Sequence, residues 1–165
     1  MCFTIVGRDA RLYHQDMRIL GVDVGQRRVG LAISDPSGTL ARPLATLQVM
    51  SADDAVRQVA AEMIRLGSEE DGLAAVVVGM PSHLDGTANR ETPLVIAFID
   101  SLKARTSVPV TEEDERLTSR EADRRLALRE RDWRKRKKQL DSAAAAIILQ
   151  DYLDRLKPEI IGPVE

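Results

Sequence analysis

The stretch from Arg18 to Asp35 constrains the fold more than any other part of the chain. Two apolar runs rich in Ile and Val stand at hairpin spacing, with Gly25 between them, and predict paired strands over residues 18–24 and 28–35. One acid, Asp23, interrupts the first run. A carboxylate in an apolar strand is costly to bury unless it is paired or holds a metal ion. Asp23 is therefore the first candidate functional residue.

Length and composition fit one globular domain. The 165 residues are 44% hydrophobic and 30% charged, and aromatic residues make up only 3%, so we expect an aliphatic core. We divide the chain into an N-terminal extension (1–17), one domain (18–156) and a C-terminal tail (157–165).

Cysteine usage and hydropathy predict a cytoplasmic protein with no membrane contact. Cys2 is the only cysteine, which excludes a disulfide within the chain and a cysteine-based zinc site. The longest apolar runs fall far short of the ~20 residues that cross a bilayer, and the N-terminus lacks an apolar signal core.

The remaining pattern predicts an α/β fold. A third strand over 39–49, interrupted at Pro43, would complete an antiparallel meander. A continuous apolar run from Leu73 to Val78 is typical of a parallel strand buried on both faces. The other predicted elements are a helix capped by Ser51 with Val56, Val59, Ala60, Met63 and Ile64 on its buried face, a helix over 90–105, a strand over 108–113, a helix beginning at Thr118 and a last helix over 140–153.

Acidic residues stand at three boundaries of these elements: Asp23, then Asp114 or Glu115, then Asp141. Ligands in α/β folds collect where strand carboxyl ends meet loops. Oxygen ligands in a cluster suit Mg²⁺ or Mn²⁺, and two such ions could activate a water for phosphodiester cleavage. Spacing alone does not show that the acids meet.

Each later acid also has a purely structural interpretation. Asp114 could be a turn residue, and Asp141 would be favourable in the first turn of a helix because of the helix dipole. Asp23 serves neither as a cap nor as a turn residue, so a functional role is favoured for it.

The net charge of −2 conceals a strongly basic segment. Residues 129–138 carry seven basic and two acidic side chains, and we expect them to form a loop or a frayed helix end. Such a run is either a solvated surface or a phosphate-binding element. Trp133 within it could stack on a base or serve as a packing anchor. We expect His83 to be a polar loop residue.

Four motifs, in order along the chain, resemble the YqgF family of bacterial Holliday-junction-resolvase-like proteins, whose assigned role is nuclease action on pre-16S ribosomal RNA. They are Ile-Leu-Gly-Val-Asp-Val-Gly (19–25) with Arg28-Val29-Gly30, Val78 to Pro81 with Asp85-Gly86-Thr87, Asp114 to Ser119, and Lys138 to Ala144 followed by Ile147-Ile148-Leu149. The resemblance covers residues 18–153. The sequence departs from the family at His83, where Asn is usual, and at Met80, where Leu is usual.

The resemblance implies an RNase H-like fold, with a five-stranded mixed sheet of three antiparallel and then two parallel strands flanked by helices. It also implies a metal site of Asp23, Glu115 and Asp141, with Asp114 as the alternative second acid. Mg²⁺ or Mn²⁺ would be the cofactor.

The resulting hypothesis is a metal-dependent nuclease. Its candidate phosphate-binding residues are Arg116 and the basic run Arg134, Lys135, Arg136, Lys137 and Lys138, with Arg27 and Arg28 as weaker candidates. We expect Gly25 and Gly30 to let the hairpin turn tightly and to give substrate or metal a close approach to the strand.

The resemblance points to maturation of the 5′ end of 16S ribosomal RNA, with ribosomal particles as candidate partners. Resolution of branched DNA is the alternative. Either a monomer or a homodimer fits, and a dimer would favour DNA. A non-catalytic assembly or transcription factor is a second hypothesis, and an actin-like ATPase fragment is disfavoured because that fold needs two domains.

Overall fold

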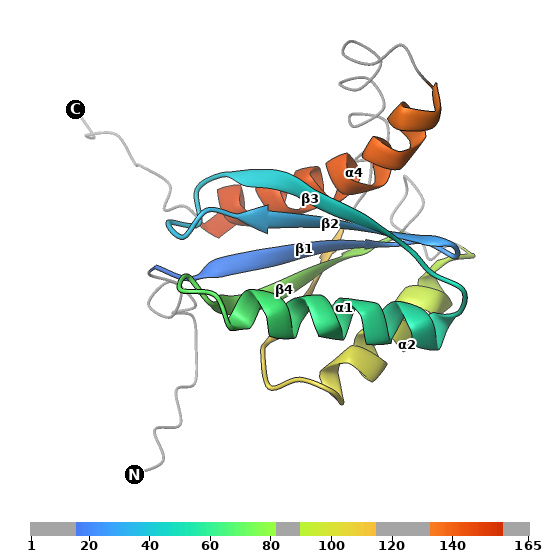
Figure 1. Cartoon of the computed structure of the whole chain (residues 1–165), viewed down its shortest axis with the longest axis horizontal. Helices are drawn as coiled ribbons and strands as arrows, with labels where there is room; N and C mark the ends of the chain where they lie inside the picture. The colour runs from blue at the N-terminus through green and yellow to red at the C-terminus, as the bar shows by residue number, and fades with distance from the viewer. Residues whose placement is uncertain (1–15, 82–89, 115–132, 157–165) are drawn as a thin grey trace, which may run out of the picture.

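The computed structural model describes residues 16–81, 90–114 and 133–156, which form three layers (Figure 1). A five-stranded sheet with the order β3-β2-β1-β4-β5 carries α1 and α2 on one face and α4 on the other. The elements are β1 (Arg18–Val24), β2 (Arg28–Ser34), β3 (Ala41–Gln48), α1 (Ala52–Gly67), β4 (Leu73–Met80), α2 (Thr92–Lys103), β5 (Val110–Asp114) and α4 (Trp133–Leu156).

The strand pairing confirms the predicted meander and the mixed sheet. β1 pairs with β2 and β2 with β3 in antiparallel fashion, whereas β4 lies parallel to both β1 and β5. The β2–β3 register shifts between Leu31 and Ala32, next to the Ala32–Pro43 pair. Pro43 cannot donate to the ladder, which explains why it is tolerated only in this edge strand.

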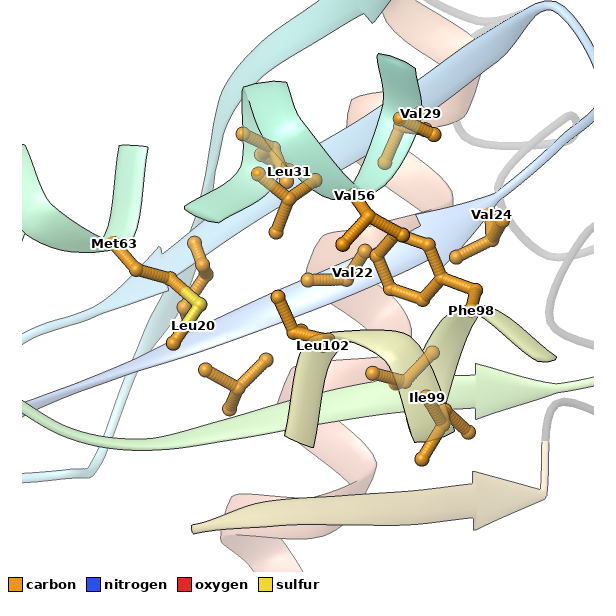
Figure 2. Close-up of a cluster of buried hydrophobic side chains, with 14 of the residues drawn as sticks. Leu20, Val22, Val24, Val29, Leu31, Val56, Met63, Phe98, Ile99 and Leu102 are labelled. Atoms are coloured by element: carbon orange, nitrogen blue, oxygen red, sulfur yellow. The ribbon is translucent and has the colours of Figure 1, made fainter. Parts of the chain in front are cut away.

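Alternation along β1 assigns its side chains to two different cores. Leu20, Val22 and Val24 point toward α1 and α2, where they pack against residues such as Phe98 (Figure 2). Among the described residues, Phe98 is the only aromatic in the buried hydrophobic core, which confirms the aliphatic character. Ile19 packs instead on the α4 side. Asp23, four residues after Ile19, therefore faces α4.

The α1 helix begins as predicted and departs from the prediction at one position. Ser51 caps it, because its Oγ accepts a hydrogen bond from the Asp54 backbone N–H (3.1 Å). The predicted buried face is wrong at Ile64, whose side chain is 75% exposed. The buried stripe runs through Val59, Met63 and Leu66, at the spacing of three and four that keeps residues on one helix face.

The last helix is longer than the sequence pattern predicted. α4 begins at Trp133 rather than at residue 140, so the backbone of residues 134–138 is helical. Of the two forms predicted for this segment, a loop or a frayed helix end, the loop is therefore wrong. The physical reason is that this segment contains no Gly or Pro, and Arg, Lys and Gln are strong helix formers. None of the helices described here combines the length and the apolar character needed to cross a bilayer.

Several predictions fall on residues outside the described ranges. These are the helix beginning at Thr118, the loop containing His83, the N-terminal extension before residue 16 and the tail from residue 157.

Candidate active site

Asp23 lies opposite a glycine on the neighbouring strand. In the β1–β2 ladder the partner of Asp23 is Gly30. Paired residues of adjacent antiparallel strands point to the same face of the sheet, about 4.5–5.5 Å apart. The space beside the partly exposed Asp23 side chain is therefore not filled by a side chain from β2.

The α4 backbone fills the space above Gly30. A Cβ atom at this position would lie 2.0 Å from the backbone oxygen of Asp141 and 2.9 Å from the nitrogen of Ser142. Gly21, two residues before Asp23, makes a similar approach, with Leu149 Cβ 2.8 Å from the place of its missing Cβ. The glycines thus bring α4 onto the sheet and place Asp141 beside Asp23. The space above Gly30 is occupied by α4. The prediction that Gly30 gives substrate or metal a close approach to the strand is therefore wrong.

Arg28, at the start of β2, pairs with Asp141. Its Nε lies 2.8 Å from Oδ2 of Asp141, and the two side chains are 29% and 24% exposed. Oδ2 of Asp141 is shielded from solvent. Arg28 also lies diagonally across the ladder from Asp23, two positions before Gly30. We call Asp23, Arg28 and Asp141 the β1–α4 site.

The position of Asp141 excludes one structural interpretation. Because α4 begins at Trp133, Asp141 is in its third turn and not in its first. The helix dipole acts only within the terminal turn, so it does not explain this acid. Asp141 is instead held where α4 crosses Gly30.

Of the two candidates for the second acid, only Asp114 lies within the described residues. Asp114 is exposed and ends β5, where it is paired with Met80. It lies four residues after Val110 and so points to the same face of the sheet, and Val110 packs with the core under α1 and α2. The Asp114 side chain thus lies on the face opposite Asp23. Glu115 and Arg116 lie outside the described residues. Within residues 16–81, 90–114 and 133–156, no three His, Cys, Asp or Glu side chains form a group that could hold a metal.

The sequence analysis missed Glu113. Its side chain is 4% exposed and lies on the α4 side of β5. Glu113 is paired with Gly79 of β4, and the preceding residue of β4, Val78, is paired with Val22 of β1. Glu113 therefore stands at the level of Asp23, two strands away. Its carboxylate is ion-paired with Arg155 of α4. Side chains alternate between the two faces along β5, so Glu113 could have been predicted to be buried if the position of α4 had been known.

We expect Arg155→Ala to lower the free energy of unfolding by about 1–2 kcal/mol, because it leaves the buried Glu113 carboxylate without its cation. The value is at the low end of the range for buried ions since Arg155 itself is 62% exposed. Urea unfolding measures the change. The double variant Arg155→Ala, Glu113→Gln should recover part of the loss, and an equal or larger loss would show that the pair is not the cause.

Arg27, a candidate phosphate-binding residue, directly precedes Arg28 in the chain. Arg27 is exposed in the hairpin turn, which is closed by a hydrogen bond from Gly25 N to Arg28 O (2.9 Å). Val49 N, just after β3, donates to Arg27 O (3.0 Å). The run from Arg134 to Lys138 forms the first turns of α4. Lys138 precedes Asp141 by about 4.5 Å along the helix axis.

Comparison with protein families identifies relatives over most of the chain. Residues 17–155 match the family model described as "RuvX: Holliday junction resolvase". A protein of Desulforudis audaxviator named "Putative pre-16S rRNA nuclease" is 37% identical over 86% of this chain and 96% of its own length. A protein of the same name from Chloroflexus aurantiacus is 42% identical over 84% of this chain and 88% of its own length.

Solved structures show the same fold at low sequence identity. Thermus thermophilus RuvC superposes with a TM-score of 0.51, at 17% identity, over 85% of this chain and 96% of RuvC. The RuvC structure in complex with a Holliday junction substrate gives a TM-score of 0.50 at 18% identity, with the same coverage. The chain therefore has the RNase H-like fold that the resemblance to the YqgF family implied, with the β1–α4 site at the carboxyl end of its first strand.

Proposed function

The chain belongs to the RuvX family of Holliday junction resolvase-type nucleases, and from this membership we propose that it hydrolyses phosphodiester bonds with the help of a divalent metal ion. The observation that carries the proposal is that the α4 backbone at Asp141 packs on Gly30, which is the ladder partner of Asp23. Asp23 and Asp141 are 118 positions apart in the sequence. We propose Asp23, Asp141 and a second acid after β5, Glu115 or Asp114, as the catalytic and metal-binding set.

The donor chemistry fits Mg²⁺ or Mn²⁺. Partly exposed carboxylate oxygens at the carboxyl end of β1 suit hard divalent ions, which keep several waters and engage phosphate oxygens. Asp23 and Asp141 would hold the ion, with the second acid completing the set. When bound, the ion would activate a water and stabilise the charge that develops on the phosphate. The carboxylates of Asp23 and Asp141 would orient the ion and its waters at the carboxyl end of β1.

The basic run supports nucleic acid as the substrate class. Arg134, Lys135 and Arg136 lie in the first turn of α4, where their positive charges oppose the helix dipole, which favours negative charge at a helix N-terminus. A polyanionic backbone on this helix would offset that unfavourable arrangement. We therefore propose phosphate contacts for Arg134, Lys135, Arg136, Lys137 and Lys138, and also for Arg27, Arg28 and Arg116.

The names of the relatives favour precursor 16S ribosomal RNA as the substrate, with ribosomal particles as its setting. The test is cleavage of a 5′-extended precursor 16S fragment and of a four-way DNA junction by the purified chain, with Mg²⁺, Mn²⁺ or EDTA. We expect divalent-dependent trimming of the RNA. Preferred paired cuts in the junction, by a stable dimer, would support the resolvase alternative that the family description favours.

No cleavage of either substrate with either ion would contradict the nuclease proposal. A non-catalytic RNA-binding factor would then remain, and the basic run offers the measurement that detects it. Changing Arg134 and Lys135 to Glu should weaken RNA binding about tenfold or more and reduce its salt dependence, whether or not the chain is catalytic.

A further inference from the structure

Arg28 lies against the carboxylate that the proposed metal would use. We propose that Arg28 is a positioning residue that alternates between two partners: it pairs with Asp141, and it moves to a backbone phosphate when a divalent cation takes that carboxylate. The inference rests on the proposed metal site. It adds a coupling between metal binding and nucleic-acid binding.

Arg28 and a metal cation would compete for one carboxylate, that of Asp141. Arg28 Nε is 2.8 Å from Oδ2 of Asp141, and that oxygen is closed to solvent. A cation that used both oxygens of Asp141 would have to displace Arg28. A cation that used only Oδ1 would sit beside a positive guanidinium. In either geometry Arg28 opposes the cation.

Two opposing effects determine whether Arg28 raises or lowers the affinity for the metal. Residues that orient a metal ligand typically contribute 10–100-fold to metal affinity, so loss of Arg28 could weaken binding. However, Arg28 is a full positive charge next to a doubly charged ion, and a contact between partly buried groups is screened less than one at the surface. We infer that repulsion prevails and that Arg28 lowers the affinity for the metal.

The Arg28 guanidinium can leave Asp141 for a second, solvent-facing partner. Arg28 lies at the start of β2, next to the exposed turn residue Arg27. Its side chain is already 29% exposed, so a change of rotamer takes the guanidinium to solvent without moving the strand. A phosphate there would offer the planar, charge-assisted contact that suits arginine.

Titration of the full chain with Mn²⁺ alone, by calorimetry and without nucleic acid, tests the competition. We expect Arg28→Gln to bind Mn²⁺ about tenfold more tightly than wild type, because the charge is gone. Arg28→Lys should stay close to wild type, because it keeps the charge. Equal or weaker binding by Arg28→Gln would overturn the inference, whereas no Mn²⁺ binding by any of the three proteins would contradict the metal site itself.

Binding of a short single-stranded RNA in EDTA tests the exchange of partners. Asp141→Asn should release Arg28 and raise RNA affinity about 3–10-fold, and the double variant with Arg28→Gln should lose that gain. Asp23→Asn removes the same charge while leaving the Arg28–Asp141 pair, so it should gain less. A gain that persists in the double variant would show that Arg28 does not carry it.

Discussion

Asp23→Asn is expected to lower divalent-dependent cleavage by about 10³-fold or more while the chain stays folded and still binds RNA. Asparagine keeps the shape of the side chain, but it replaces a charged oxygen ligand by a neutral one, and metal stabilisation of the reacting phosphate amounts to several kcal/mol. Asp23 is partly exposed at the end of β1, so the free energy of unfolding should change by about 0.5 kcal/mol or less. Single-turnover cleavage with Mg²⁺ or Mn²⁺, together with urea unfolding, measures both quantities.

The matched control for this variant is Asp100→Asn, which makes the same chemical change on the exposed side of α2, in the layer opposite α4. It should cleave like wild type. If Asp23→Asn also cleaved like wild type, the catalytic role of the β1–α4 site would be wrong.

The same assay assigns the second acid. Asp114 lies on the face of β5 that packs under α1 and α2, so Asp114→Asn should have the smaller effect and Glu115→Gln the larger. The opposite order would show that the end of β5 turns its last residue toward α4.

The hairpin was predictable from the sequence because local rules determine it. Apolar runs on both sides of Gly25 specify two strands at turn spacing, and the observed β1 has the predicted bounds. The acid at Asp23 was visible for the same reason, since it interrupts an apolar pattern. The parallel position of β4 followed from a continuous apolar run, which is typical of a strand covered on both faces.

The site that Asp23 belongs to depends on contacts between distant residues. Arg28 and Asp141 are 113 positions apart, and no spacing rule links them. A charged segment in front of Asp141 resembled a loop, so the acid was placed in a first helical turn where its charge had an ordinary explanation. Glu113 was missed because its inward direction appears only once β5 is known to lie under α4.

Gly30→Ala should disrupt the β1–α4 site, and more strongly than the same change at Gly21, where the nearest atom belongs to a side chain. The Cβ added at Gly30 would stand 2.0 Å from a backbone oxygen of α4, and a backbone segment cannot rotate away as a side chain can. We expect α4 to shift by about 1 Å and the free energy of unfolding to fall by about 1–3 kcal/mol. A displacement of that size in a catalytic group typically costs about 10²-fold in rate. Unfolding in urea and cleavage per folded molecule measure the two effects.

Two control variants separate the site from stability. Gly67→Ala adds the same methyl group at the exposed end of α1, with no atom within 4 Å, and should stabilise the chain by about 0.5–1 kcal/mol. Leu102→Ala removes a fully buried side chain from the opposite layer and should cost about 2–5 kcal/mol without moving α4. If Leu102→Ala kept its cleavage rate per folded molecule while Gly30→Ala lost it, the loss would come from the position of Asp141. Equal losses in both would instead make cleavage depend on global stability, and the contact between Gly30 and α4 would then have no catalytic importance of its own.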